Sequence, residues 1–229
     1  MEKYIEKLEQ LDLGRRVAGG SCSDIYLFDE GFYFKCFNED YRNLNDSINI
    51  EFYETVRYLS DISGLPFIVR GQDIYRSKNE LFGYSMPIIL ADQLYDANDD
   101  VLIDDILKSL DLLNYDIRKL ADNYVNTEDI GGDNILYNGN MYLLDLDLSL
   151  VDKRYIPDEL YERTLHSILC AVRSKILGDE RCDDVVKDCD YLDYFKRIRD
   201  ICSNNFDSGV KTIGQFRRAY QKTDKRYFD

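Results

Sequence analysis

The feature that most constrains the fold is that a strand pattern and a helix pattern occupy separate parts of the chain. Up to about residue 89 the pattern is that of strands around one helix, which is expected over about residues 47–62. From Ile103 to Tyr124, apolar residues recur at alternating steps of three and four, which indicates a long amphipathic helix. Because strands precede helices instead of alternating with them, the sequence predicts an α+β protein.

The strand-rich part contains three predicted hairpins. Residues 15–20 and 23–37 predict three strands, with the second hairpin turn at residues 29–31. The alternation after that turn places Tyr33, Lys35 and Phe37 on one face of the strand. Residues 67–89 predict a strand, a turn at Lys78 and Asn79, and a second strand.

The helical part contains two further predicted helices. One begins at Pro157, a favoured first-turn residue, and ends at Gly178. The other covers about residues 191–202. The change of pattern near residues 87–92 divides the chain into an expected first part, residues 1–88, and a second part, residues 89–229.

Composition excludes several classes of protein. The net charge of −15 argues against a nucleic-acid binder, which needs a basic surface to neutralise phosphates. No apolar run reaches the roughly 18 residues of a membrane span, and the first residues do not form a signal peptide, so we expect a cytoplasmic protein without membrane contact. The six cysteines form no CxxC pair, which favours reduced thiols over a structural zinc site.

One run, from Thr127 to Asp147, carries the residue types of a phosphoryl-transfer site. Asp129 stands five residues before Asn134, and a predicted hairpin then leads to Asp145. Phosphoryl transfer needs one carboxylate for the acceptor hydroxyl and hard oxygen ligands, such as an amide and a second carboxylate, for Mg²⁺. The predicted hairpin brings Asn134 and Asp145 side by side.

Two features further upstream fit the same chemistry. Residues 18–25, AGGSCSDI, form a small-residue turn between strands, where backbone N–H groups can approach a phosphate closely. Lys35 follows on the next strand, ten residues after Ile25.

In this order, these features resemble the protein-kinase-like superfamily, and the resemblance covers nearly the whole chain. It implies a two-lobed fold, with an antiparallel sheet and one helix in residues 1–88 and a mainly helical lobe in residues 89–229. It also implies a small atypical, bacterial-type kinase that uses Mg²⁺ and ATP, or GTP, to phosphorylate a hydroxyl group.

The resemblance implies a role for each candidate residue. Asp129 would serve the acceptor hydroxyl. Lys35 would contact the phosphates and pair with a helix glutamate, Glu54 by preference and Glu51 as the alternative. Asn134 and Asp145 would hold the metal. The nucleotide would be bound by the glycine-rich loop, the gatekeeper and the hinge, which are represented by Val17, Gly19, Gly20, Ser21, Ser23, Ile25, Met86 and Ile88.

Several residues depart from the family pattern. Ala18 and Ser23 stand where glycines are usual, Tyr33 replaces a small alanine, and Thr127 and Glu128 replace the histidine and arginine before the catalytic aspartate. The absence of that arginine makes docking of a phosphorylated activation loop unexpected. The short segment after Asp145 also leaves little room for an activation segment.

Three functions therefore remain open in addition to an atypical protein kinase acting on Ser or Thr. The first is an inactive pseudokinase that serves as a binding module. The second is a small-molecule kinase with a cationic acceptor, because between residues 92 and 133 twelve Asp or Glu accompany only three Lys or Arg. The third is nucleotidyl transfer by the same fold.

Overall fold

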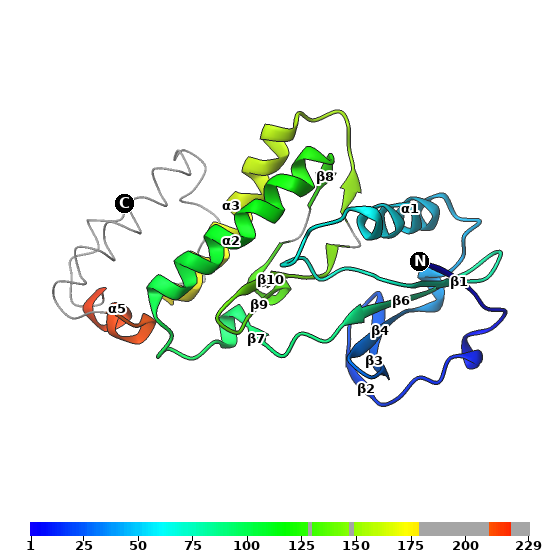
Figure 1. Ribbon diagram of the computed structural model, residues 1–229, viewed down its shortest axis with the longest axis horizontal. Coiled ribbons are helices and arrows are strands. Elements are labelled where there is room, and N and C mark those ends of the chain that lie inside the picture. The colour runs from blue at the N-terminus through cyan, green and yellow to red at the C-terminus, as the bar shows by residue number, and fades with distance from the viewer. Residues whose placement is uncertain (128–129, 147–148, 179–210, 221–229) are drawn as a thin grey trace. The chain divides into compact units, whose positions relative to one another are not determined.

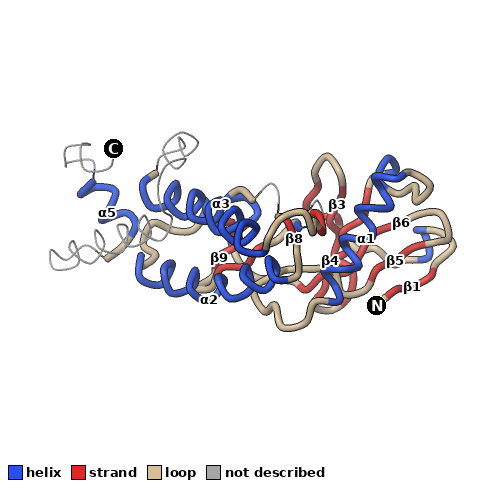
Figure 2. Tube along the Cα trace, turned by 90° about the horizontal axis from the view of Figure 1, so that it is seen from above, coloured by secondary structure: helices blue, strands red, loops and turns tan. Residues whose placement is uncertain are grey.

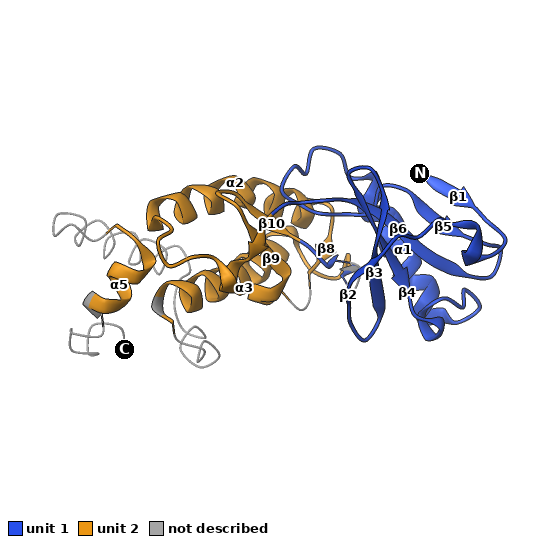
Figure 3. Ribbon diagram, turned by 90° about the horizontal axis from the view of Figure 1, so that it is seen from below, with its two compact units in different colours: residues 1–90, 144–151 blue, residues 91–143, 152–229 orange. Residues whose placement is uncertain are grey.

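The protein is described here from a computed structural model that defines residues 1–127, 130–146, 149–178 and 211–220. It is a mixed α+β structure, as predicted, with a six-stranded sheet and several α-helices. The chain divides into two compact units (Figure 3). Unit 1 comprises Met1–Leu90 and Leu144–Val151, and unit 2 comprises Ala91–Leu143 and Asp152–Asp229. The sequence pattern does not indicate that residues 144–151 belong with the first unit.

Unit 1 is built on the six-stranded sheet, in which the three predicted hairpins are found (Figure 1). The strand pairs are antiparallel except for the first strand, which lies parallel to its neighbour at one edge. In spatial order the strands are β1 (Glu2–Tyr4), β5 (Ile74–Arg76), β6 (Leu81–Pro87), β4 (Phe32–Phe37), β3 (Ser23–Asp29) and β2 (Arg16–Gly19). Two 3₁₀ turns, η1 (Leu8–Gln10) and η2 (Glu39–Tyr41), and the short strand β11 (Leu150–Val151) complete the unit with one helix.

That helix, α1 (Ser47–Asp61), begins where the sequence predicts it. The Oδ1 atom of Asp46 accepts a hydrogen bond of 2.9 Å from the backbone N–H of Ile48, a standard N-cap contact. The buried face of α1 packs on the sheet in one apolar cluster, formed by Phe37, Phe52, Tyr53, Val56, Ile74, Leu81 and Tyr84. The helix therefore covers part of one face of the sheet and fixes it to the core of unit 1.

The strand predicted from residue 67 is mostly wrong, because only Ile74–Arg76 pairs in the sheet. The preceding residues make other contacts. Arg70 donates from Nη1 to the carbonyl of Leu59 at 2.7 Å, which caps the end of α1. A Cβ atom on Gly71 would lie 3.0 Å from the ring of Tyr84, so this segment lies close against the sheet. Side-chain contacts that no local pattern encodes thus decide its conformation.

Unit 2 contains two long helices, which lie side by side in Figures 1 and 2. The predicted apolar stripe of the first is buried from Ile103 to Leu120, with Leu113 fully inaccessible. The second begins at Pro157 and ends at Leu177, and Gly178, whose φ of 71° suits glycine, caps its end as predicted. The helix expected at residues 191–202 lies outside the described residues.

The elements of unit 2 also include a small sheet, in the order β10, β9, β7. The predicted hairpin after Asn134 is confirmed, with Met141 opposite Tyr137. The elements are β7 (Asp92–Gln93), η3 (Leu94–Asp96), α2 (Ile103–Asp122), β8 (Val125–Asn126), η4 (Gly132–Asn134), β9 (Ile135–Tyr137), β10 (Met141–Leu143), α3 (Pro157–Leu177) and α5 (Ile213–Tyr220). No helix within the described ranges is long and apolar enough to cross a membrane.

Candidate functional site

Lys35 occupies the middle of the sheet of unit 1. It lies on β4, opposite Ile25 on one side and Tyr84 on the other, and only 6% of the residue is exposed. Its Nζ atom donates to Oδ1 of Asp145 and forms an ion pair with it, although 110 residues separate the two in sequence. Because a buried ammonium group is costly without a partner, this carboxylate is an integral part of the environment of Lys35.

The backbone of Lys35 is fixed by a close approach of β6. Gly83 has a φ of +153°, and a Cβ atom built on it would lie 1.9 Å from the carbonyl oxygen of Lys35. Only glycine fits between the two strands at this point. The close approach of Gly83 therefore holds the main chain of Lys35, and Asp145, which lies outside the sheet, holds its ammonium group.

Asp145 combines an unusual backbone with an accessible carboxylate. Its φ of 64° places it in the left-handed region, which Asp adopts more readily than most residues. The side chain remains 42% exposed, so the carboxylate group is partly accessible to solvent. The next residue, Leu146, is 4% exposed and lies among Val56, Leu59 and Tyr84. Burial of Leu146 thus anchors the segment that presents Asp145 to Lys35.

The turn between β2 and β3 is closed by backbone contacts. The N–H of Gly20 donates to the carbonyl of Ser23 at 2.8 Å, and the Nδ2 atom of Asn38 donates to the carbonyl of Ser21 at 2.8 Å. A Cβ atom on Gly20 would meet nothing within 4 Å. Local packing therefore gives no reason for glycine at position 20.

Gly19, in contrast, has a structural explanation. The Arg16 guanidinium pairs with the Asp24 carboxylate across it, with Nη2 and Oδ1 2.7 Å apart. A Cβ atom on Gly19 would lie 2.1 Å from Nη2 of Arg16 and 2.2 Å from Oδ1 of Asp24. Val17 lies at the irregularity of β2 between Arg16 and Ala18, where it is 39% exposed.

The other predicted nucleotide contacts share one face of the sheet with Lys35. Ile25 is opposite Lys35 and Met86 is opposite Tyr33, and residues directly opposite in an antiparallel sheet share a face. Ile25, Tyr33 and Met86 are half-buried. The N–H of Ile88 donates to the carbonyl of Gly31 at 2.9 Å, so this predicted hinge donor is already used within the protein.

The helix glutamates do not approach Lys35 closely enough for an ion pair. Glu54 and Glu51 both lie on the exposed face of α1, and within the described ranges neither forms an ion pair. The role assigned to Glu54, and the choice between it and Glu51, stay predictions.

The remaining predicted residues belong to unit 2. Asn134 is the last residue of η4, half-buried, and its backbone N–H donates to the carbonyl of Gly131 at 3.0 Å. Asp129, the predicted acceptor-side residue, lies outside the described residues. Since Asn134 and Asp145 fall in different units, each is described within its own unit. The described part of the chain contains no group of three or more His, Cys, Asp or Glu residues placed to hold a metal ion.

No disulfide joins the described cysteines, namely Cys22, Cys36 and Cys170. Cys36 is buried beside Lys35 in β4, and burial raises the pKa of its thiol. A protonated, buried thiol is unreactive, so the structure supports a packing role for Cys36.

Two supporting residues of the site were not predicted from the sequence. Gly83 stands alone inside a strand pattern, a signal of close backbone approach that could have been used. Leu146 reads as an ordinary apolar residue, and its anchoring role depends on contacts that are distant in sequence.

Comparison with models of known protein families gives no match to this chain. Comparison with curated proteins gives no match either.

Proposed function

We propose that the protein is a Mg²⁺-dependent phosphotransferase that moves the γ-phosphoryl group of ATP or GTP to a hydroxyl group. The observation that carries this proposal is the ion pair between buried Lys35 and the left-handed, solvent-accessible Asp145. A non-glycine residue in a sparsely populated backbone conformation, beside a buried charge, is typical of functional sites.

The chemistry of the donor groups fits a nucleotide and a magnesium ion. The Asp145 carboxylate and the Asn134 amide are hard oxygen donors of the kind that Mg²⁺ prefers. Bound Mg²⁺ would supply neutralisation of phosphate charge. Lys35 would bind phosphate oxygens, and the turn at Gly20 leaves open space where a phosphate group can approach the backbone. Asp129 would accept a hydrogen bond from the acceptor hydroxyl and orient it.

The leading acceptor is a protein Ser or Thr side chain, and a cationic small molecule is the alternative. The acidic stretch between residues 92 and 133 favours a cationic acceptor by attraction. The short segment between Asp147 and Pro157 also favours this alternative, because it leaves little chain to form a platform for a peptide. The preference for Ser or Thr rests on the resemblance to small atypical protein kinases.

One observation favours a second function, a binding module without turnover. The N–H of Ile88 is engaged by Gly31, and Tyr33 is half-buried on the face of the sheet that bears Lys35. Both features reduce the room and the donors available to a nucleobase. A pseudokinase would retain the Lys35–Asp145 pair as a structural contact.

The test combines nucleotide binding with labelled transfer. We expect Mg·ATP to raise the melting temperature of the protein, and label on the γ-phosphate to be transferred to an acceptor or to water. Lys35→Met and Asp145→Asn should each lower turnover about 100-fold or more, because phosphate and metal contacts contribute several kcal/mol to transition-state stabilisation. Asp145→Asn keeps a residue that tolerates the left-handed backbone.

Two surface substitutions in unit 1 serve as matched controls. Lys78→Met and Asp61→Asn change the same residue types at exposed positions and should leave binding and transfer unchanged. Absence of any thermal shift at millimolar Mg·ATP would refute the enzyme proposal. Binding without transfer would favour the pseudokinase, and transfer of label from the α-phosphate would indicate nucleotidyl transfer.

A further inference from the structure

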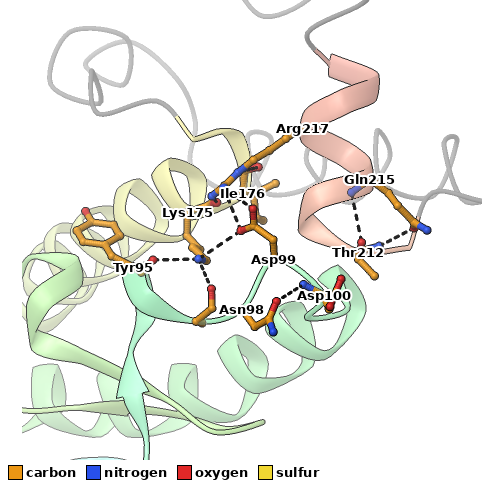
Figure 4. Close-up of polar contacts among 10 residues, drawn as sticks. Tyr95, Asn98, Asp99, Asp100, Lys175, Ile176, Thr212, Gln215 and Arg217 are labelled. Atoms are coloured by element: carbon orange, nitrogen blue, oxygen red, sulfur yellow. Dashed lines mark hydrogen bonds and ion pairs between the residues drawn. The ribbon is translucent and has the colours of Figure 1, made fainter.

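Unit 2 contains a second buried lysine, which is not part of the candidate site. Lys175 lies near the end of α3 and is 5% exposed. Its Nζ atom donates to the carbonyl oxygens of Tyr95, at 2.9 Å, and of Ala97 (Figure 4). The Oδ1 atom of Asp99 lies 3.7 Å away and balances the charge. The ammonium group is therefore used fully inside the protein.

Asp99 links this lysine to helix α5. The Nη1 atom of Arg217 lies 3.0 Å from both carboxylate oxygens of Asp99, and its Nη2 atom donates to the carbonyl of Lys175 (Figure 4). The backbone adds two hydrogen bonds to the region before α2, from Ile213 to Val101 at 3.1 Å and from Gly214 to Asp99 at 2.8 Å. Lys175, Asp99 and Arg217, which we call the Lys175 cluster, thus join α3, α5 and the chain before α2.

Burial lowers the pKa of Lys175, the Arg217 guanidinium lowers it further, and Asp99 opposes both effects. Burial of this lysine costs free energy of desolvation, which an apolar side chain of similar volume in the same space would not cost. Unlike an apolar side chain, Lys175 can donate hydrogen bonds to two carbonyl groups of one short segment, those of Tyr95 and Ala97.

That segment supports the turn that ends at Asn134. A Cβ atom on Gly132 would lie 2.2 Å from the Tyr95 ring, so the ring lies directly on this glycine. The Nε2 atom of Gln93 donates to the carbonyl of Asp133 at 3.3 Å. Gln93 also pairs with Leu136 in the small sheet. The η4 turn therefore packs against the chain from Gln93 to Ala97.

We propose that Lys175 is a positioning residue, which holds the Tyr95 ring against Gly132 and thereby fixes the η4 turn and the place of Asn134. Its catalytic consequence rests on the proposed function, in which Asn134 is a metal ligand. The sequence of contacts lies entirely within unit 2. Each link is a hydrogen bond, an ion pair or a steric contact between described residues.

The first experiment measures this support directly, without reference to activity. Amide hydrogen exchange reports the backbone hydrogen bonds of η4, from Asn134 to Gly131 and from Ile135 to Gly132. We expect Lys175→Met to accelerate exchange at Asn134 and Ile135 about tenfold, the effect of losing roughly one net hydrogen bond of local stability. Lys175→Arg, which keeps a cationic donor, should restore much of the protection.

Two further variants keep the experiment decisive if Lys175→Met fails to fold. The Tyr95 side chain is 43% exposed, so Tyr95→Ala should fold and show the same loss of protection, whereas Tyr95→Phe keeps the ring and should not. Lys108→Met, at a lysine whose side chain is 68% exposed on α2, is the matched control and should leave exchange unchanged. Unchanged exchange at Asn134 and Ile135 in both Lys175→Met and Tyr95→Ala would overturn the proposal.

The second experiment tests the catalytic consequence by separating metal dependence from nucleotide affinity. Lys175→Met and Tyr95→Ala should raise the Mg²⁺ concentration for half-maximal transfer about tenfold, with the KM for nucleotide at saturating Mg²⁺ unchanged. A merely structural role would lower the active fraction and leave both constants as they are. If the wild-type protein transfers no phosphate, the proposed function fails, and the exchange experiment still decides the role of Lys175.

Discussion

Replacement of Gly83 by alanine tests whether the approach of β6 to β4 holds the backbone of Lys35. The new Cβ atom would lie 1.9 Å from the carbonyl oxygen of Lys35, far inside any allowed contact. Separation of the strands or overpacking of this kind costs about 1–3 kcal/mol. The φ of +153° adds strain of about 1–3 kcal/mol for a residue with a side chain. We therefore expect Gly83→Ala to lower the free energy of unfolding by about 2–6 kcal/mol.

Two glycines of the same unit separate the contributions. Gly31 has a φ of +82° and open space around it, so Gly31→Ala carries backbone strain alone and should cost about 1–2 kcal/mol. Gly20 has open space and no left-handed backbone, so Gly20→Ala should change stability by less than about 0.5 kcal/mol.

Urea unfolding followed by circular dichroism measures all three variants. In thermal unfolding, at about 2–4 °C per kcal/mol for a chain of this length, Gly83→Ala should melt at least about 4 °C below the wild type. If Gly83→Ala were as stable as Gly31→Ala, or more stable, the steric contact would not lower the free energy of unfolding. In that case the explanation for the fixed backbone of Lys35 would be wrong.

Three further predictions concern other parts of the chain. Arg154 lowers the pKa of Asp152 from 3.8 to about 2 by side-chain and backbone hydrogen bonds, so the stability that this ionised carboxylate contributes is present above about pH 4 and lost as the pH falls towards 2. Asp152→Asn should therefore flatten the dependence of the urea midpoint on pH between about pH 4 and pH 2. An unchanged slope in this variant would contradict the prediction. Asp46→Ala should destabilise by about 1 kcal/mol through loss of the N-cap of α1, with Asp46→Asn close to wild type in the same unfolding measurement. Leu113→Ala should cost about 2–5 kcal/mol, because the side chain is fully buried on α2, and a loss below 1 kcal/mol would show that the core of unit 2 is loosely packed there.

Elements with strong local signals were predictable from the sequence. The apolar steps of α2, the start of α1 near residue 47 and the Pro157 and Gly178 limits of α3 are all local, and the structure confirms them. The strand predicted from residue 67 failed because Arg70 and Gly71 are held by α1 and by Tyr84, which are distant in sequence. β1 was missed because three residues are too few to show a period, and a parallel partner gives no turn signal.

The candidate site was likewise only partly predictable from the sequence. The sequence order placed Lys35 on a strand and Asp145 after a hairpin, and the structure brings the two together. It could not reveal the left-handed backbone of Asp145, and it could not reveal the burial of Leu146, which lies beside Val56 and Leu59 of α1. The function, the metal ligands and the role of Asp129 stay predictions.

Unit 1 is formed by two chain segments that are distant in sequence, and this affects the order in which the protein folds during synthesis. A ribosome that has synthesised the first 90 residues has delivered the whole six-stranded sheet and α1, yet Lys35 still lacks its counterion. That partner is synthesised more than 50 residues later, after the first segment of unit 2, Ala91–Leu143, which ends with the β9–β10 hairpin. Closing so long a loop is slow compared with forming local hairpins. We therefore expect the insertion of Leu146 beside Val56 to be a late event in folding, and the isolated fragment of residues 1–90 to be less stable than the same segment in the complete chain.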